Sequence, residues 1–212
     1  MVPIPGNTKT TSFEERLTHA KNVFWQHAQK LFPGYEVDDH NREGIVQCMV
    51  YYLGGNPEMY PALSPKKGLM LTGDVGSGKS LLMEILQSIT KGCQGYGFRI
   101  FKACDICDEY AFGSRGQSYG EQWQNGKVKT FCMCVDDLGF EPLRAMSYGN
   151  ELIPLAHVLT KRYTLFDRYG AVTHITTNLS ADEIEENYGD RIRDRLRKMC
   201  NVIVLDGPSR RK

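Results

Sequence analysis

The chain has 212 residues, a length that allows one or two domains of ordinary size. Its 26 Lys and Arg residues nearly balance its 25 Asp and Glu residues, so the net charge of +1 excludes a globally basic nucleic-acid coat protein but not a local basic face. No run approaches the ~18 apolar residues of a membrane span. Because the sequence also lacks a signal-peptide pattern and has an odd number of cysteines, 7, we expect a cytoplasmic protein with reduced thiols.

Residues 1–60 are predicted to form a tail and a short helical extension. Ser12, with Glu15 three positions later, matches a capping box that starts a helix. Apolar residues then recur at helical spacing until Pro33-Gly34, and a second amphipathic helix is predicted from Arg42 to Leu53. Two interpretations of this helix pair remain open: packing against the following domain, or docking of a partner protein.

From residue 61 onward, short apolar runs alternate with helical patterns. This alternation is typical of crossover connections, so we predict an α/β domain over residues 61–212, with a parallel sheet covered by helices on both faces. A polar, glycine-rich stretch from Gly113 to Gly126 is predicted to be an exposed loop. The buried strands are predicted at Gly68–Thr72, Phe98–Phe101, Phe131–Val135, Ala171–Thr176 and Val202–Leu205.

The first apolar run leads into a phosphate-binding motif. Residues 73–80 match the P-loop pattern G-x-x-x-x-G-K-[ST], in which glycines allow close approach to phosphate and backbone N–H groups supply partial positive charge. Lys79 would reach the β- and γ-phosphates, and the Ser80 hydroxyl would ligate Mg²⁺. The strand–loop–helix context favours ATP and Mg²⁺ binding over a chance match. The predicted nucleotide-binding residues are Gly73, Asp74, Val75, Gly76, Ser77, Gly78, Lys79 and Ser80.

Polar side chains end two further predicted strands. Asp136 follows an apolar strand and suits Mg²⁺ binding, while Asp137 is placed to orient or deprotonate the attacking water. An alternative is that the paired acids simply end the strand. Asn178 ends the next strand, where it could fix that water or contact the γ-phosphate, although an Asn there is also typical of a helix cap.

A basic run follows, with arginines at every second position from Arg191 to Arg197. On a helix, Arg191 and Arg195 share one face. Five acids within residues 182–190 favour a salt-bridged surface helix. The alternative is that one arginine stabilises phosphoryl charge at a neighbouring subunit, as an arginine finger does.

Together, the motifs at 73–80, 136–142, 176–180 and 188–196 resemble the DnaC/IstB group of AAA+ ATPases, which are helicase loaders and transposition helpers. The resemblance implies a parallel five-stranded AAA+ sheet with little or no lid domain, and ATP hydrolysis at subunit interfaces. It also implies that Asn178 is the first sensor, that Arg195, or else Arg191, is the finger, and that Arg210 is the second sensor.

The predicted activity is ATP hydrolysis that depends on assembly. We expect this hydrolysis to be slow, because Asp137 stands where many AAA+ enzymes have the longer Glu. We expect a protein that loads or remodels a replication machine, with a replicative helicase or a transposase as partner and with self-association through the ATP site. The alternatives are a transposition helper and a nucleotide-dependent adaptor with negligible catalysis.

Aromatic and cationic residues interleave between the second and third predicted strands, a composition that suits single-stranded DNA. The alternative is that the first aromatic residues belong to a helix face in the core and the others to a loop. Cys104, Cys107, Cys132 and Cys134 could ligate zinc, but buried apolar cysteines are the favoured interpretation, and we expect no zinc. The candidate DNA contacts are Tyr110, Phe112, Arg115, Tyr119, Trp123 and Lys127.

Overall fold

A five-stranded parallel sheet forms the centre of the computed structural model, which describes residues 12–93, 96–111, 119, 121–124, 127–147 and 150–210. The strand order is β2-β5-β8-β1-β9, so the first strand lies inside the sheet and the chain crosses over it. All four pairings between neighbouring strands are parallel, which confirms the predicted sheet. The strands are β1 (Gly68–Thr72), β2 (Phe98–Lys102), β5 (Cys132–Leu138), β8 (Thr173–Thr177) and β9 (Cys200–Val204).

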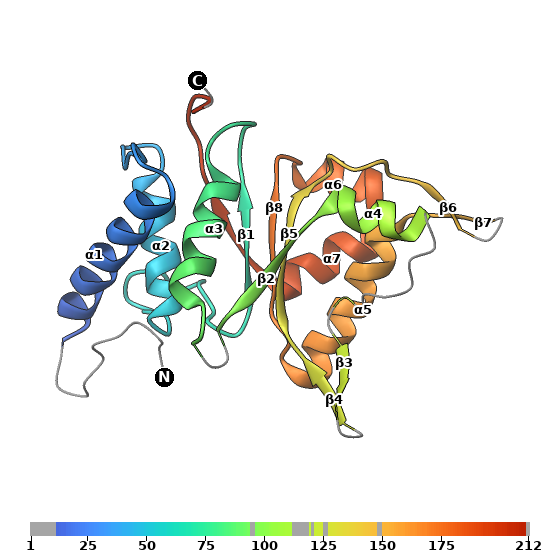
Figure 1. Ribbon diagram of the computed structural model, residues 1–212, viewed down its shortest axis with the longest axis horizontal. Helices are drawn as coiled ribbons and strands as arrows, with labels where there is room; N and C mark the ends of the chain where they lie inside the picture. Colours follow the sequence, from blue (N-terminus) through green and yellow to red (C-terminus); the bar gives the residue numbers. More distant parts are fainter. Residues whose placement is uncertain are drawn as a thin grey trace.

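Helices cover both faces of this sheet (Figure 1), as the sequence predicted. Each helical layer contributes to its own hydrophobic cluster, because both faces of a parallel sheet must be shielded from water. Among the described residues, no helix is both long and apolar enough to cross a membrane. One layer holds α1 (Phe13–Leu31), α2 (Arg42–Tyr52) and α3 (Lys79–Thr90), and the other holds α4 (Ala103–Ala111), α5 (Pro154–Tyr169), α6 (Ala181–Tyr188) and α7 (Asp190–Met199).

The two N-terminal helices pack against the domain that follows them. The capping box of Ser12 and Glu15 is present at the start of α1, and His27 Nδ1 lies 2.9 Å from the Ser88 hydroxyl of α3. Helix α2 is buried almost all round, and a Cβ added at Gly44 would lie 2.5 Å from Leu205 Cδ2. Packing, the first of the two sequence interpretations, therefore describes both helices, which share one hydrophobic cluster with β1 and β9.

Two sequence predictions need correction. Strand β5 continues to Leu138, so the paired acids lie inside the strand rather than after it. Part of the predicted loop 113–126 is instead a strand, because β3 (Glu121–Gln124) pairs with β4 (Lys127–Thr130) as an antiparallel hairpin. The two-residue connection has the sequence Asn-Gly, the strongest short-range hairpin signal, and composition alone obscured it. A second small hairpin joins β6 (Ala145–Ser147) to β7 (Asn150–Leu152).

Arg162 is fully buried at the end of the sheet where β5 and β8 begin. Its Nε donates to Thr173 Oγ1 at 2.8 Å, and its terminal nitrogens donate to the backbone oxygens of Phe131, Ala171 and Val172. The guanidinium thus provides hydrogen-bond donors for backbone oxygens where the strands enter the sheet, and the Val172 oxygen also accepts the Met133 backbone N–H at 3.2 Å. This side chain therefore ties α5 to two neighbouring strands.

His174, in the middle of β8, is a second buried titratable group. Its ring is 2% exposed, its Nδ1 accepts a hydrogen bond from the Leu69 backbone N–H at 3.1 Å, and its centroid lies 4.7 Å from that of Phe98. Burial, and secondarily the positive charge of Arg162, lower the pKa of His174 from 6.5 to about 3. The ring is therefore neutral and accepts a hydrogen bond inside the sheet.

Acid should destabilise the protein through His174. The folded pKa lies below the unfolded one, so this contribution is intact above pH 6.5 and is lost as pH falls from 6.5 toward 3, when the unfolded chain takes up a proton. At pH 5 the loss is about 2 kcal/mol of unfolding free energy. Urea unfolding at pH 7 and pH 5 should show this loss in the wild type but not in His174→Asn, whose amide oxygen can replace Nδ1 as acceptor. His19→Asn, at an exposed position, is the control and should follow the wild type. Equal pH dependence in His174→Asn and the wild type would contradict the assignment.

Candidate nucleotide site

The P-loop connects β1 to α3 at the carboxyl edge of the sheet. Gly78 caps α3 in the left-handed conformation, with φ of 96°, and the helix begins at Lys79. The N-terminal N–H groups of α3 therefore face the loop, where an anion is stabilised by the helix dipole. Gly76 has a φ of 86°. A side chain would not fit at this position, because an added Cβ would lie 2.3 Å from Ser209 Oγ.

Lys79 is buried within its own loop. Its Nζ donates to the backbone oxygens of Gly73 and Asp74, each at 2.7 Å, and lies 3.4 Å from Ser77 Oγ. The residue is 6% exposed, so its cationic group lies inside the loop. This cation and the N–H groups at the start of α3 together suit the loop to an anionic group.

The two acids of β5 are organised by one threonine of the neighbouring strand. The Thr176 hydroxyl donates to Asp136 Oδ1 at 2.6 Å and accepts the backbone N–H of Asp137 at 2.8 Å. The β5–β8 register shifts between Val135 and Leu138, and Asp137 has a φ of 58°. Such a bulge re-aims a side chain. Asp136 therefore stays buried in the sheet, while Asp137 lines the cavity beside the P-loop.

A cavity of about 440 Å³ brings most of the predicted site residues together. Its walls come from the P-loop, the start of α3, the ends of β5 and β8, and the segment after β9. Asn178 lines it, and it is Ser180, not Asn178, that caps α6 with Glu183 in a capping box. The lining residues are Val75, Gly76, Gly78, Lys79, Ser80, Leu81, Asp137, Phe140, Asn178 and Arg210.

Arg210 reaches this cavity from the segment after β9. Its backbone N–H donates to the Gly76 oxygen at 3.0 Å, and Leu205 N–H donates to the Thr72 oxygen at 2.8 Å. A Cβ built on Gly78 would lie 3.5 Å from Arg210 Cδ. The segment therefore lies along the P-loop and adds a second cation to the site.

These groups suit a nucleoside triphosphate with Mg²⁺. Oxygen ligands are the ones that Mg²⁺ prefers, and Ser80 and Asp136 offer them beside the loop. Glu84 of α3 lies near Asp136, and burial, with the Asp136 carboxylate as the second cause, raises the pKa of Glu84. Among the described residues there is no group of three or more Cys, His, Asp or Glu side chains that could enclose a metal ion, and a site that keeps several waters and uses few protein ligands is usual for Mg²⁺.

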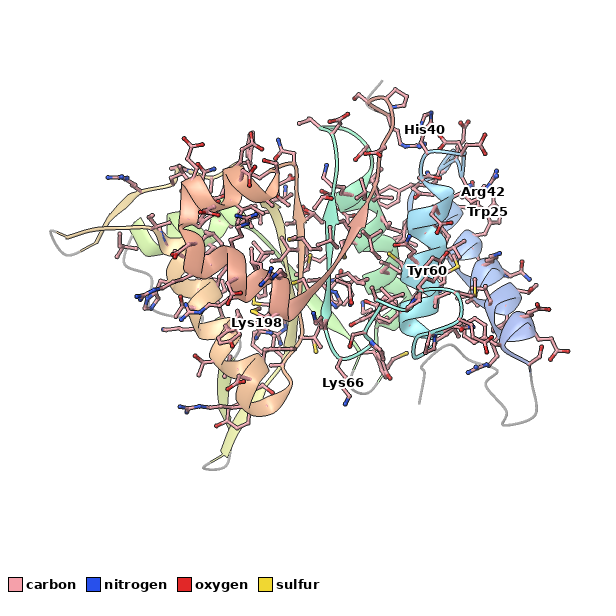
Figure 2. All side chains as sticks on the ribbon, turned by 180° about the vertical axis from the view of Figure 1, so that it is seen from behind. Trp25, His40, Arg42, Tyr60, Lys66 and Lys198 are labelled. Atoms are coloured by element: carbon pink, nitrogen blue, oxygen red, sulfur yellow. The ribbon has the colours of Figure 1, made fainter. Side chains whose placement is uncertain are left out.

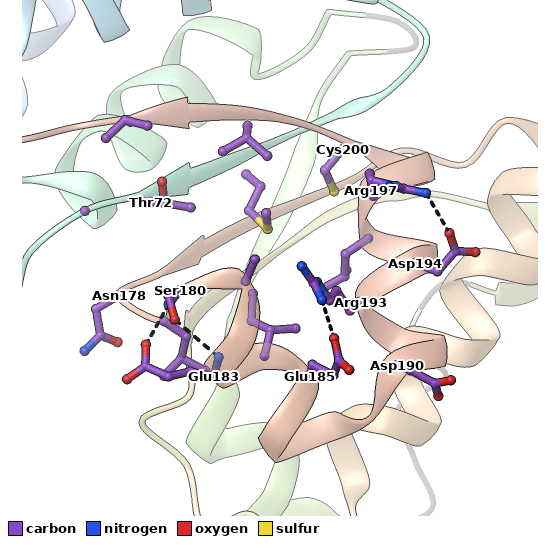
Figure 3. A pocket seen from close by; sticks show the side chains of 18 of the residues that line it. Thr72, Asn178, Ser180, Glu183, Glu185, Asp190, Arg193, Asp194, Arg197 and Cys200 are labelled. Carbon is purple, nitrogen blue, oxygen red and sulfur yellow. Dashed lines mark hydrogen bonds and ion pairs between the residues drawn. The ribbon is translucent and has the colours of Figure 1, made fainter.

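A larger hollow of about 810 Å³ adjoins the nucleotide cavity between the sheet edge and helices α6 and α7 (Figure 3). Its lining includes Gly73 and Asp74 of the P-loop, and Asn178, which also lines the nucleotide cavity. Lys79 and Ser80 do not line this hollow. Because the P-loop lysine and helix N-terminus face the smaller cavity, the chemistry belongs there despite its smaller size.

The arginines of α7 have different surroundings. Arg193 forms ion pairs with Glu185 and Asp182, and Arg197 with Asp194, as expected for a salt-bridged surface helix. Arg195 is half-buried against α5 of its own chain, where Nη1 donates to Thr160 Oγ1 at 2.6 Å and the guanidinium lies 5.4 Å from the Tyr163 ring centroid. Arg191 is exposed and forms no ion pair with a residue in the described part of the chain.

The structure describes few of the candidate DNA contacts. Tyr119 is 8% exposed, donates a hydrogen bond to Glu109 and lies edge-on to Phe101, so its ring belongs to the core and does not present a stacking surface. Tyr110, Trp123 and Lys127 lie in α4, β3 and β4, but their side chains, like the whole of Phe112 and Arg115, are outside the described structure.

Cys107 and Cys134, two of the four cysteines considered as zinc ligands, are buried. Burial raises the pKa of the Cys107 thiol to about 12 and that of Cys134 well above its ordinary value. Cys107 and Cys134 therefore act as small apolar core residues.

Residues 62–212 match the family described as IstB-like ATP binding protein. The chain belongs to this family. The match agrees with the motif resemblance and identifies the nucleotide of the family as ATP. No curated protein matches the chain significantly in sequence.

Two solved structures have a similar fold. The DnaC helicase loader is 19% identical, with a TM-score of 0.54 over 86% of this chain and 98% of that one. AMPPCP-bound DnaA from Aquifex aeolicus is 16% identical, with a TM-score of 0.52 over 81% of this chain and 48% of that one. At such identities the likeness concerns the fold, and the predicted AAA+ architecture of a P-loop on a five-stranded parallel sheet is confirmed.

Sequence reasoning missed two site residues. Thr176 is the last residue of a strand predicted from the sequence, and nothing in that pattern indicates that its hydroxyl contacts both acids. Phe140 is 80% exposed at the mouth of the cavity. The sequence around Phe140, four positions after Asp136, does not indicate that this large apolar side chain is exposed. Only the structure could therefore identify it as a site residue.

Gly76→Ala should weaken nucleotide binding and displace the segment that contains Ser209. The added Cβ meets Ser209 Oγ at 2.3 Å, and φ of 86° strains any side chain. Gly34→Ala is the matched control, since φ is 92° there but no atom lies within 4 Å. Both variants should lose about 1–2 kcal/mol of stability from the left-handed conformation. Only Gly76→Ala should lose affinity for a fluorescent ATP analogue, and equal affinity in the two variants would contradict this geometry.

Proposed function

We propose that the chain is an ATPase that is active on assembly and uses ATP to load or remodel a DNA-bound protein machine. One observation carries the proposal: a single cavity holds the P-loop with Lys79 and Ser80, the Asp137 carboxylate and the Asn178 amide, with Asp136 directly behind them. Each group lies at the carboxyl end of a parallel strand or at the N-terminus of α3, where α/β proteins bind their ligands.

Bound ATP with Mg²⁺ supplies an activated γ-phosphoryl group for transfer to water. Lys79 would exchange its carbonyl partners for phosphate oxygens, and Ser80 and Asp136 would hold the metal with its water shell. Asp137 orients the attacking water and takes up its proton, and Asn178 fixes that water through its amide. The short reach of Asp137 makes slow turnover the expected behaviour.

Self-association through the ATP site is part of the proposal. Phe140 is 80% and Val75 58% exposed, and both lie at the mouth of the cavity. Exposed apolar groups beside a catalytic cavity favour an interface with another copy, because association removes them from water. The resemblance of the motif around Arg195 favours this residue as the finger that completes the neighbouring site, with Arg191 as the second choice.

A replicative helicase is the proposed partner, with a transposase as the alternative, and both follow from the family resemblance. The similar DnaC structure is that of a helicase loader, which supports the first choice through fold alone. We propose contact with single-stranded DNA through Tyr110, Phe112, Arg115, Trp123 and Lys127. Stimulation of turnover by single-stranded DNA would favour a loader over an adaptor with negligible catalysis.

Substitutions at Lys79 and Asp137 should separate binding from hydrolysis. Lys79→Ala should weaken ATP affinity about 10- to 100-fold, because hydrogen bonds to charged groups are lost. Asp137→Asn should retain affinity but lower turnover by about 10²- to 10⁴-fold, the usual contribution of a general base. Isothermal titration with ATP and phosphate release measure the two quantities. Full turnover in Asp137→Asn would remove this residue from the mechanism, and an absence of ATP binding by the wild type would overturn the proposed function.

A mixing experiment should decide whether Arg195 acts on a neighbouring copy. Arg195→Ala alone should lose about 10³-fold or more of turnover, as expected for an arginine finger, while retaining ATP affinity. Mixed with Lys79→Ala in equal amounts it should recover about a quarter of wild-type turnover, because that share of head-to-tail interfaces pairs an intact P-loop with an intact arginine. A mixture that stays inactive would contradict action in trans.

Two variants control for the contacts that Arg195 makes inside its own chain. Thr160→Val removes the hydroxyl that accepts from Arg195 but leaves the guanidinium, so it should keep turnover. Arg191→Ala removes an equal charge from the same helix. If Arg191→Ala, and not Arg195→Ala, abolishes turnover and is rescued by mixing, the finger is Arg191.

A further inference from the structure

Asp38 connects the loop between α1 and α2 to the nucleotide cavity. Its two carboxylate oxygens accept hydrogen bonds from Arg210 Nη2 at 2.8 and 2.7 Å. The two residues are 172 positions apart in the chain, and their side chains are 41% and 21% exposed. This partly buried ion pair joins the N-terminal extension to a residue that lines the ATP site.

The carboxylate of Asp38 is held in place by its own loop. Oδ1 accepts the backbone N–H groups of His40 and Asn41 at 3.0 and 3.2 Å, and the Asp38 N–H donates to Asn41 Oδ1 at 3.0 Å. Asn41 is 3% exposed and donates to the Glu36 oxygen. Although partial burial acts in the opposite direction, the bonds from Arg210 and these backbone groups lower the pKa of Asp38. The side chain is a fixed anion.

Arg210 is fixed between this anion and the P-loop. Its backbone N–H donates to the Gly76 oxygen, and its Cδ lies within van der Waals distance of a Cβ built on Gly78. Its Nε is buried and has no hydrogen-bond partner among the described residues. A buried N–H without a partner is costly, so the cavity offers an unused donor beside the place where phosphate binds.

The same two segments also meet at a second point. A Cβ built on Gly207 would lie 2.8 Å from His40 Cβ, and Figure 2 shows His40 beside the segment that follows β9. The α1–α2 loop, the P-loop and the segment 205–210 are therefore packed as one unit around the site. A change in the position of Arg210 must be accommodated by the α1–α2 loop.

We propose that Asp38 is a positioning residue for ATP binding, which holds the Arg210 guanidinium over the P-loop with Nε directed to the phosphates. Through this ion pair the α1–α2 loop responds to the bound nucleotide. The N-terminal extension therefore differs between the nucleotide-bound and the nucleotide-free protein. The inference rests on the proposed ATPase function and on the family resemblance that makes Arg210 the second sensor.

Asp38→Asn is the direct test, because the amide oxygen can still accept the loop N–H groups while the charge that orients Arg210 is lost. ATP affinity should fall about threefold to tenfold, the effect of a partly buried charged hydrogen bond. Asp39→Asn is the matched control: it removes the same charge one position away, where the carboxylate pairs with Arg42 at 2.9 Å and is 90% exposed. The control should bind ATP like the wild type, and Asp38→Glu should recover part of the affinity.

Two further variants separate positioning from a structural role. Asp38→Asn combined with Arg210→Ala should bind ATP no more weakly than Arg210→Ala alone, because both act through one contact. The exchange Asp38→Arg with Arg210→Asp restores an ion pair, so it should recover thermal stability but not ATP affinity. Recovery of affinity by the exchanged pair would show that the contact is merely structural and would overturn the proposal.

Hydrogen exchange tests the response of the loop. ATP should protect the backbone amides of residues 35–41 in the wild type and in Asp39→Asn, but not in Asp38→Asn or Arg210→Ala. Wild-type affinity in Asp38→Asn, or protection that does not depend on Arg210, would overturn the inference while leaving the ATPase proposal intact. A wild-type protein that does not bind ATP would overturn both.

Discussion

Parallel pairing of all five strands is the constraint on which the site depends. Since every strand runs the same way, the P-loop after β1, the acids of β5 and Asn178 after β8 all reach one edge of the sheet. Because β1 lies between β8 and β9, it borders the strand that carries Asn178, and the strand with the acids is one position further. The crossover in strand order therefore brings a cation, two acids and an amide into one cavity.

Within this edge, small polar groups set the orientation of the charged ones. Thr176 bonds to the side chain of Asp136 and to the backbone of Asp137, so one hydroxyl holds the first acid in the sheet and supports the bulge that directs the second outward. A left-handed φ at a residue other than glycine is costly, and such conformations cluster at functional sites. Lys79 donates to two backbone carbonyls of the P-loop and so places positive charge beside the N-terminus of α3.

The N-terminal helices contribute to this arrangement more than their position before the P-loop domain suggests. They share a hydrophobic cluster with β1 and β9, and the loop between them supplies the partner of Arg210. An extension packed in this way can transmit a change at the site, because the ion pair, the contact at His40 and the buried face of α2 are continuous. The proposed link between nucleotide and extension follows from this packing.

The sequence by itself determined the fold class, the five strands and the capping box of α1, and it predicted most of the residues that line the candidate nucleotide cavity. These features are local: a P-loop is a spacing of glycines before Lys79, and a strand is a run of apolar residues. The incorrect predictions also had local causes. The composition of residues 113–126 obscured the Asn-Gly hairpin signal between β3 and β4. The aromatic character of Tyr119 gave no indication that this residue is buried.

Only the tertiary structure decided the partners of charged groups far apart in the chain. Asp38 has no visible relation to Arg210 across 172 positions, and the α7 arginines are indistinguishable by spacing although Arg195 bonds to Thr160 and Arg193 to Glu185. The physical reason is that periodicity encodes which face of an element is buried, whereas an ion pair depends on how elements pack. Packing is set by the whole core at once, so no single segment carries that information.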